Sequence, residues 1–519
     1  MASMRRWSLA AAVFLAAQSQ GAEMSPAPSE AVTLGVQIVD IFTCPATLPP
    51  GEKGICVAAV RPGGAADRAG LRSGDVIMRI GTSPVTGQQE LQAAMSPLRV
   101  DQTVEIHYRR GEGTGLARVH FEASDRRGAS PAAGFPTATL PQTDACEATL
   151  QPDVAVLKLP FRKLPLAMDA ESLKALLGDK PSTVALQGDV LTLAFRAPGN
   201  AATVSGGIQC ALDRLGDTDL WALQLQMPQW QQAFLSADFL ATGGSARGLM
   251  AQMGQPPTGI AHSQFRGSAA PPPPAGTAPL HGSLVTATVP SRFLGAPKEV
   301  SVYLPPMRGS RPLPVLYMTD GQWVEPFAAL VEALIESGRI RPIAIVAEHS
   351  GRNTGDVSQP FDSRQDNRSR EYLPDVDPRR FANHMQFFVD ELLPWAEKNY
   401  GLSGSRVDRA AMGYSNGGAF VSALGAQHPE SFASVLPFSP ADRLSRREVP
   451  TGDPARLPRF LFAGGELEPN FLASARTDAA WLQARGVAAQ VRSYWSGHDT
   501  LMWQLALAEY LPTVFPPGR

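Results

Sequence analysis

Short apolar runs alternate with longer amphipathic stretches throughout the C-terminal half of the chain. The apolar runs predict strands at 300–304, 313–318, 341–347, 408–414, 433–438, 459–463 and 489–495. The amphipathic stretches predict helices at 326–336, 381–400, 473–485 and 501–511. Pro394 is expected to bend the second of these helices. Buried strands that alternate with helices are typical of a doubly wound, mostly parallel sheet, so residues 283–519 are predicted to form one large α/β unit.

The first half of the chain begins with a β-rich unit at residues 32–124. Its pattern predicts strands at 54–60 and 103–109, with a helix at 88–95 between them. The stretch that follows, 125–142, is rich in Gly, Pro, Ala and Ser and is predicted to be a linker.

A second small unit is predicted at residues 143–250. Strand-like alternation at 184–195 and 220–227 and a short helical stretch at 171–177 indicate a mixed α/β or mostly β fold. No spacing of polar residues in this unit indicates catalysis, so its role is left unassigned. Residues 251–282 contain a run of four prolines and are predicted to be a semi-rigid linker.

The N-terminus has the features of a secretory signal peptide over residues 1–22. Arg5 and Arg6 precede a short apolar run at 9–17, and small residues follow at the expected cleavage zone. An uncleaved membrane anchor is the alternative, but the apolar run is short for a membrane span. We therefore expect a periplasmic or secreted protein without a stable membrane span.

Composition narrows the function classes further. The chain has 519 residues, of which 44% are hydrophobic and 18% charged, as in ordinary globular proteins. Its formal net charge of −2, without a basic stripe, argues against a nucleic-acid-binding protein.

The four cysteines are expected to pair in an exported protein. Three connectivities are possible, and pairs between Cys44 and Cys56 and between Cys146 and Cys210 would each cross-link one unit. The sequence has no C-x-x-C and no His/Cys cluster with metal-ligand spacing, so neither a metal nor an organic cofactor is predicted.

A Gly-x-Ser-x-Gly pentapeptide at 413–417 stands between the predicted strand at 408–414 and a small-residue helical pattern at 418–424. Strand, tight turn and helix are the context of a nucleophile elbow, which lifts a serine hydroxyl out of the sheet. The glycines permit this turn because they lack a Cβ atom. Ser415 is therefore the candidate nucleophile, and the backbone N–H of Asn416 would point at the developing oxyanion.

A serine nucleophile needs a base within hydrogen-bond reach, and the base needs an orienting carboxylate. In the chain order of α/β-hydrolases the histidine comes last. Among the histidines of the C-terminal unit, only His498 follows both the elbow and the last predicted strand. The others are His349, His384 and His428.

The acid is expected after a strand between the elbow and His498. The strand at 459–463 is followed by Glu466 and Glu468, and the strand pattern does not choose between them. A Ser/His pair without an acid is a further alternative. Weaker candidates for the acid are Asp442 and Asp478.

Six stretches, spread in order over residues 283–519, carry a resemblance to a known family. They are 315–322 (VLYMTDGQ), 368–372 (RSREY), 390–394 (DELLP), 413–418 (GYSNGG), 468–471 (EPNF) and 497–499 (GHD), with Trp503 beyond the last. In these stretches the unit resembles the putative esterase family that includes the enterochelin esterases, on an α/β-hydrolase fold.

The resemblance implies Ser415 as nucleophile, His498 as base and Glu468 as acid, because Glu468 stands at the family's acidic position. It also implies an oxyanion hole made by the backbone N–H groups of Gly321 and Asn416.

Arg368 and Glu371 match a family pattern near the site and are expected to shape it rather than to react. The first half of the chain departs from the family's usual N-terminal module, so the resemblance does not extend to a siderophore substrate.

The run at 60–77 (VRPGGAADRAGLRSGDVI) resembles PDZ domains of the bacterial protease-associated type, and the resemblance covers nearly all of the first unit. In such domains Leu34, Gly35 and Val36 would lie where backbone N–H groups capture the C-terminal carboxylate of a peptide. The peptide adds as a strand beside them. A PDZ fold that only packs against its neighbours is the alternative.

Together these patterns predict an exported serine esterase that acts on a small-molecule ester and carries a PDZ module for a peptide or a protein C-terminus. Two alternatives remain open from sequence. The same triad would also serve an acyltransferase or a peptidase, and a PDZ-based binding protein could carry a degenerate hydrolase scaffold.

Overall fold

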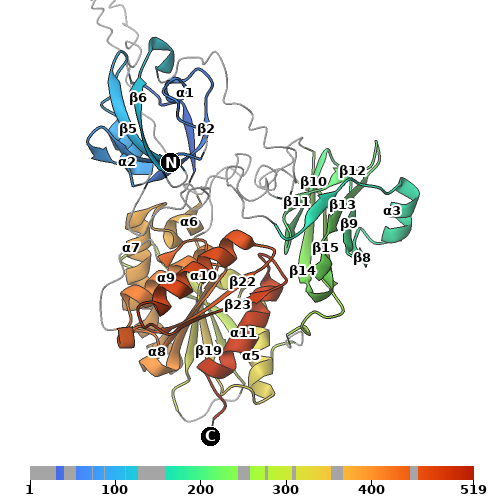
Figure 1. Cartoon of the computed structure of the whole chain (residues 1–519). Coiled ribbons are helices and arrows are strands. Elements are labelled where there is room, and N and C mark those ends of the chain that lie inside the picture. Colours follow the sequence, from blue (N-terminus) through green and yellow to red (C-terminus); the bar gives the residue numbers. More distant parts are fainter. Residues whose placement is uncertain are drawn as a thin grey trace, which may run out of the picture.

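The chain folds into three units (Figure 1). The computed structural model describes residues 31–39, 54–72, 74–86, 88–110, 113–126, 146, 159–243, 257–274, 279–306, 311–351, 366–444 and 454–518. The predicted signal peptide and Cys44 lie outside these residues. Among the helices that are described, none combines the length and the apolar character needed to cross a bilayer.

The N-terminal unit is an antiparallel sheet in the order β1-β2-β3-β5-β6, with β4 paired to β3. Its apolar core confirms the predicted strands and the helix at 88–95. Its elements are β1 (Val36–Val39), β2 (Ile55–Val60), α1 (Ala65–Arg68), β3 (Val76–Ile80), β4 (Ser83–Pro84), α2 (Gln88–Met95), β5 (Thr103–Arg110), β6 (Gly113–His120) and η2 (Ala123–Asp125).

The middle unit is mostly β and consists of two antiparallel sheets, β11-β10-β14-β15 and β12-β13-β9-β8, with β7 paired to β13. Both sheets contribute to one core, in which Phe195 stacks on Phe239 at 5.3 Å between ring centroids. The elements are β7 (Arg162–Leu164), α3 (Ala170–Leu177), β8 (Ser182–Gln187), β9 (Val190–Arg196), β10 (Ala201–Gly206), β11 (Cys210–Ala211), β12 (Asp213–Arg214), β13 (Leu220–Gln226), η4 (Pro228–Gln232), β14 (Phe234–Thr242) and β15 (Pro257–Arg266).

The strand-like alternation at 184–195 is confirmed and forms a hairpin of β8 and β9, which turns at Gly188 with a φ of +62°. One prediction was wrong, because the predicted linker at 251–282 contains β15, which pairs with β14 along its length. Because β15 is an edge strand with many exposed positions, its sequence lacks the apolar content of a buried strand.

The expected disulfide between Cys146 and Cys210 is present and joins positions that are 64 apart in sequence. Cys56 is also disulfide-bonded, and its partner lies outside the described residues.

The C-terminal unit has an eight-stranded sheet in the order β16-β17-β19-β18-β20-β21-β22-β23. The six strands from β19 to β23 in this order run parallel, whereas β16 and β17 are antiparallel at one edge. This confirms the doubly wound, mostly parallel sheet. The strands are β16 (Ser283–Val289), β17 (Lys298–Leu304), β18 (Val315–Met318), β19 (Ala344–Glu348), β20 (Arg409–Tyr414), β21 (Ser434–Phe438), β22 (Arg459–Gly465) and β23 (Ala489–Tyr494).

Helices cover both faces of this sheet (Figure 1). α5 and α11 pack on one face, and α7, α8, α9 and α10 pack on the other. The helical elements are η5 (Gly321–Trp323), α5 (Glu325–Glu336), α6 (Asn367–Tyr372), α7 (Pro378–Gln386), η6 (Phe387–Leu392), α8 (Leu393–Tyr400), η7 (Arg406–Asp408), α9 (Asn416–Gln427), η9 (Pro454–Arg456), α10 (Pro469–Gln483) and α11 (Thr500–Val514).

The long helix predicted at 381–400 is interrupted by the π-helical turn η6, which precedes Pro394 in the first turn of α8. The wider π-helical turn accommodates Pro394, which would otherwise break the helix.

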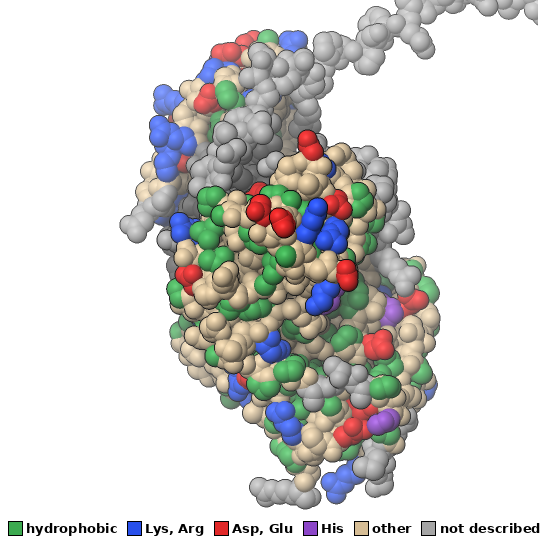
Figure 2. All heavy atoms as spheres, turned by 90° about the vertical axis from the view of Figure 1, so that its right-hand side faces the viewer, with side chains coloured by type: hydrophobic (Ala, Val, Ile, Leu, Met, Phe, Trp, Pro, Cys, Tyr) green, Lys and Arg blue, Asp and Glu red, His purple; other side chains and the backbone are tan. Residues whose placement is uncertain are grey.

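Charged groups are dispersed over the face of the molecule shown in Figure 2. Lys and Arg side chains there are interspersed with Asp and Glu, and apolar side chains are scattered between them.

We predict that Phe420→Ala lowers the free energy of unfolding by about 3–5 kcal/mol. Phe420 is fully buried in α9 and contacts the rings of Tyr372, Phe381 and Phe388. Val407→Ala is the control, because Val407 is 67% exposed and its truncation should change stability by less than about 0.5 kcal/mol. Urea unfolding followed by tryptophan fluorescence measures both, and a loss below about 1 kcal/mol for Phe420→Ala would contradict the packing described here.

Candidate active site

Ser415 lies at a sharp turn between β20 and α9, with φ of +57° and ψ of −125°. Positive φ costs a residue with a Cβ atom about 1–3 kcal/mol, so the surrounding structure must hold it in place. The N–H of Ser415 donates to the carbonyl of Phe438 at 3.0 Å, and its carbonyl accepts from the N–H of Ala441 at 3.0 Å. This is the strained strand–turn–helix geometry of a nucleophile elbow.

The two glycines of the pentapeptide are required by close packing. A Cβ atom on Gly413 would lie 2.3 Å from the carbonyl oxygen of Gly417. A Cβ atom on Gly417 would lie 2.2 Å from Oγ1 of Thr319, on the loop after β18. Any larger residue at either position would push the elbow away from the neighbouring loop.

Glu468 and His498 meet on the loops after β22 and β23. The Nδ1 atom of His498 lies 2.6 Å from Oε2 of Glu468. The other carboxylate oxygen accepts from the N–H of Gly465 at 2.8 Å and from the hydroxyl of Ser439 at 2.6 Å. Glu468 is only 5% exposed, whereas Glu466 turns outward and pairs with Arg476. The structure therefore brings Glu468, rather than Glu466, to His498.

Aromatic rings connect His498 to the elbow. Trp503 of α11 stacks on Tyr414 at 4.2 Å and forms a T-shaped contact with His498 at 5.0 Å between ring centroids. Phe471 also packs against His498, at 4.3 Å between ring centroids. Among the described residues His498 is hydrogen-bonded to Glu468 and not to Ser415, and such contacts are often loose before substrate binds.

The other histidines of this unit have different surroundings. His349 packs beside Gly321 and shares a hydrogen bond with Ser301. His384 is fully buried between Glu348 and Glu371, and His428 lies beside Glu430 at the end of α9. Each of the three thus has partners outside the 413–417 elbow.

The two predicted oxyanion donors lie at the ends of adjacent parallel strands. Gly321 begins η5 after β18, and Asn416 begins α9 after β20. The first N–H groups of a helical turn have no acceptor within it, so these donors can bind a ligand oxygen. A Cβ atom on Gly321 would lie 2.1 Å from the carbonyl of Ala347, which restricts this position to glycine.

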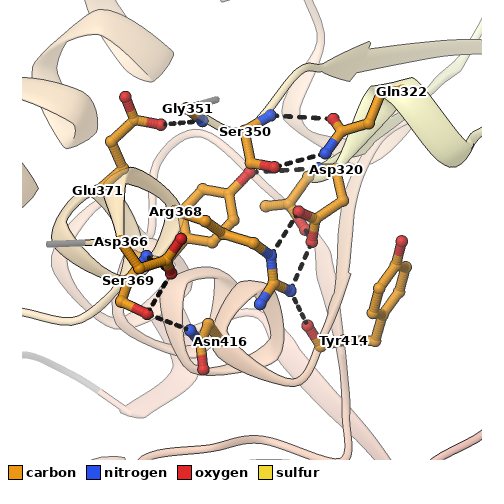
Figure 3. Close-up of polar contacts among 12 residues, drawn as sticks. Asp320, Gln322, Ser350, Gly351, Asp366, Arg368, Ser369, Glu371, Tyr414 and Asn416 are labelled. Carbon is orange, nitrogen blue, oxygen red and sulfur yellow. Dashed lines mark hydrogen bonds and ion pairs between the residues drawn. The ribbon is translucent and has the colours of Figure 1, made fainter. Parts of the chain in front are cut away.

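A buried ion pair braces the loop that carries Gly321 (Figure 3). The Nε and Nη2 atoms of Arg368 donate to the two carboxylate oxygens of Asp320 at 2.6 and 2.8 Å, and Nη2 also reaches the carbonyl of Tyr414 at 3.2 Å. Burial acts to lower the pKa of Arg368, but the Asp320 carboxylate outweighs it and raises that pKa above its ordinary value. One guanidinium thus joins Asp320, which precedes Gly321, to Tyr414, which precedes Ser415.

Asp320 has a φ of +58°, and its N–H donates to the hydroxyl of Tyr372 at 3.2 Å. That hydroxyl donates in turn to Glu348 at 2.5 Å. Burial raises the pKa of Tyr372 well above its ordinary value, so the hydroxyl keeps the proton that it donates.

Glu371 is also buried, and its carboxylate joins different segments of the unit. Its carboxylate accepts from Lys298 Nζ at 2.6 Å, from the N–H of Gly351 at 2.7 Å and from Arg380 at 3.0 Å. Arg368 and Glu371 are thus both bonded to neighbouring segments of the unit, and their role in shaping the site stays a prediction.

Sequence reasoning missed Ser439, which has a φ of +43° and donates to Glu468 while it accepts from Trp503 Nε1 at 2.8 Å. The sequence does contain a feature that points to Ser439. It directly follows the apolar strand β21, and ligands bind at the carboxyl ends of such strands.

In the N-terminal unit, Leu34 is buried and Gly35 has a φ of +74°, just before the edge strand β1. The carbonyls of Leu34 and Gly35 accept from the N–H groups of Ala66 and Arg61 at 3.0 and 2.8 Å. Val36 pairs with Val60 on β2, so the opposite edge of β1 faces away from the sheet.

One group in the described part of the chain has metal-like spacing, namely His281, Glu332 and Glu336. Glu332 already accepts from the N–H groups of His281 and Gly282 and from the hydroxyl of Tyr303. These bonds account for the buried carboxylate, and we assign no metal centre to it.

A mostly parallel sheet with a strained serine after a central strand defines the C-terminal unit as an α/β-hydrolase. Residues 291–514 match the family model described as "Putative esterase", and residues 32–120 match the model described as "PDZ domain". The C-terminal unit is thus an esterase-family domain, and the N-terminal unit is a PDZ domain.

Solved structures that are similar to parts of this chain include esterases. The enterobactin esterase of Shigella flexneri, determined in the presence of enterobactin, is 18% identical with a TM-score of 0.50, covering 67% of this chain and 99% of that one. Because residues 283–519 make up less than half of the chain, the shared fold extends into the residues before 283. A ferulic acid esterase of Anaeromyces mucronatus is 15% identical with a TM-score of 0.39, covering 48% of this chain and 97% of that one.

Among curated proteins, the serine protease Do-like HtrA of Lactococcus lactis subsp. cremoris is 32% identical over 98 residues. The match covers 18% of this chain and 24% of that protein. The chain therefore spans about a quarter of the length of the curated relatives that it matches.

We predict that Arg368→Lys lowers kcat for p-nitrophenyl acetate by roughly 10- to 100-fold, because the loop of Gly321 loses its two-point brace. Lysine keeps the charge but cannot make two parallel N–H bonds to one carboxylate. Arg370→Lys is the control, since Arg370 pairs with Asp377 at a more exposed position. Equal kcat values for the two variants would contradict a role of the Asp320–Arg368 pair in the site.

Proposed function

We propose that this protein is an exported serine esterase that hydrolyses carboxylic esters, with Ser415 as nucleophile, His498 as general base and Glu468 as the orienting acid. The 2.6 Å contact between Glu468 and His498, on loops that follow the elbow in the order serine, acid, histidine, carries this proposal. The strained backbone of Ser415 and the match of this unit to an esterase family support it.

The reaction follows from the geometry. Ser415 Oγ attacks the ester carbonyl carbon while His498 Nε2 takes its proton, and Glu468 stabilises the resulting imidazolium through Nδ1. The oxyanion accepts hydrogen bonds from the N–H groups of Gly321 and Asn416, each worth about 2.7–4 kcal/mol at comparable sites. His498 then protonates the departing alcohol, and a water activated by the same imidazole releases the acyl group.

A periplasmic or secreted location is part of the proposal. The signal-like residues 1–22 support it, as does the disulfide between Cys146 and Cys210, because disulfides persist mainly in oxidising compartments.

The PDZ domain is proposed to bind the C-terminus of a protein partner. Among the described strands β1 lies at the edge of its sheet, which supports this, since an extended peptide can add at an edge as a further strand beside the Leu34–Gly35–Val36 segment. The esterase unit would then act near that partner on a small-molecule ester.

Ser415→Ala is expected to lower kcat for p-nitrophenyl acetate by at least about 10⁴-fold with the fold intact, because no other group can form the acyl-enzyme. Wild-type protein should be labelled by a fluorophosphonate probe at Ser415, and the variant should not. Retained turnover in Ser415→Ala would contradict the assignment of the nucleophile, and absence of labelling in the wild type would favour a degenerate scaffold.

Product analysis with added alcohol or amine acceptors separates hydrolysis from acyl transfer.

Glu468→Gln is expected to reduce kcat by roughly 10²- to 10⁴-fold, because the amide no longer stabilises the imidazolium or fixes its tautomer. Glu466→Gln is the matched control in the same loop and should change kcat by less than about twofold, since it loses only an exposed pair with Arg476. A larger loss in Glu466→Gln than in Glu468→Gln would reverse the assignment of the acid.

A further inference from the structure

The middle unit lies directly against the loop that carries His498. The N–H of Phe234 donates to the carbonyl of Trp495 at 3.0 Å, and the N–H of Ser236 donates to Oδ2 of Asp499 at 2.5 Å. Both donors belong to β14 of the middle unit. The two contacts bracket His498, one before it in sequence and one directly after it.

The backbones of the two units also touch at a pair of glycines. A Cβ atom on Gly497, the residue before His498, would lie 2.0 Å from the carbonyl oxygen of Gly207. A Cβ atom on Gly207 would lie 2.3 Å from the Cβ of Leu235 and 3.0 Å from Oδ2 of Asp499. No side chain fits between the histidine loop and this part of the middle unit.

The loop of the acid is held from the same side. Leu467, the residue before Glu468, is 6% exposed and packs in the core of the middle unit together with Trp495. In the opposite direction, Phe234 of the middle unit packs in the core of the esterase unit and contacts the ring of Tyr494. The cores of the two units therefore interlock beside the catalytic loops.

The two loops are in addition bonded to each other. The N–H of Glu466 donates to the carbonyl of Tyr494 at 2.8 Å, and the N–H of Leu467 donates to the carbonyl of Ser496 at 2.9 Å. A displacement of one loop would therefore move the other, and with it the distance between Glu468 and His498.

We propose that the middle unit positions the catalytic histidine and acid, with Asp499 as the positioning residue that joins the two units. This inference rests on the triad proposed above and assigns a role to a unit in which the sequence shows no catalytic spacing. Oδ2 of Asp499 holds β14, while Oδ1 accepts from the N–H of Leu501 at 2.8 Å and caps α11, the helix that carries Trp503. One buried carboxylate thus fixes the histidine loop between a strand of the middle unit and a helix of the esterase unit.

Such support matters because catalysis requires reacting groups to be held within a fraction of an ångström, and a shift of about 1 Å can cost about 10²-fold in rate. Loops are otherwise among the least stable parts of a fold. Docking on a sandwich core gives these two loops the rigidity of the strands that they contact.

The first test is Gly207→Ala in the full-length protein, which alters the middle unit far in sequence from every proposed catalytic residue. We expect kcat for p-nitrophenyl acetate to fall about tenfold or more with KM changed by less than about threefold, because the disturbed loops hold the reacting groups. The matched control is Gly243→Ala in the same unit, where an added Cβ meets no atom within 4 Å, and its kcat should equal that of the wild type.

The second test is Asp499→Ser, which still tests the positioning role of the middle unit if Gly207→Ala does not fold. Serine can still cap α11, but it is too short to reach Ser236 as well, so the variant separates helix capping from contact between the units. Asp238→Asn is its control, since Asp238 lies on β14 in an exposed pair with His262. We expect Asp499→Ser to lose kcat and fluorophosphonate reactivity in parallel while its circular dichroism is unchanged.

The proposal is overturned if Asp499→Ser, together with any folded Gly207→Ala protein, keeps kcat and probe reactivity within about twofold of the wild type while Ser415→Ala is inactive. Turnover that survives in Ser415→Ala would instead count against the proposed triad itself.

Discussion

The backbone of Ser415, held at a φ of +57°, is the constraint on which the rest of the site depends. It is not alone, because Asp320 and Ser439 also have positive φ, and the described residues include just one other such residue that is not glycine. The three follow β18, β20 and β21, which are neighbours in the sheet. The strain is thus concentrated at one edge, at the ends of the buried strands β18, β20 and β21, which hold the turns in place.

Each strained turn is secured by a polar bond that other parts of the unit supply. Asp320 is gripped by Arg368, Ser439 donates to Glu468, and Ser415 is bonded through its backbone to the loop after β21. Buried bonds of this kind are stronger than exposed ones and costly to leave unmade, so the three turns cannot relax independently. The groups that form the site are therefore the same groups that keep the sheet edge from unfolding locally.

The sequence was sufficient to nominate the parts of the candidate site that depend on local pattern. Ser415 and His498 could be proposed from sequence because an elbow and a loop after the last strand have recognisable signatures in chain order. The choice between Glu466 and Glu468 could not be made from the strand pattern, since it depends on which carboxylate turns toward Ser439 and Gly465. β15 was missed because an edge strand takes its definition from its partner, β14, and not from its own apolar content.

Contacts between units were the least accessible to sequence reasoning. The bond from Ser236 to Asp499 joins residues 263 positions apart, and neither residue type marks an interface. What sequence does record is the pair Gly207 and Gly497, whose lack of side chains lets the two backbones approach. A local turn would explain a glycine before His498 equally well. The close approach of Gly497 to Gly207 can therefore be recognised only from the structure. The loops of Glu468 and His498 thus rest partly on contacts outside the esterase domain, and the middle unit supplies these contacts.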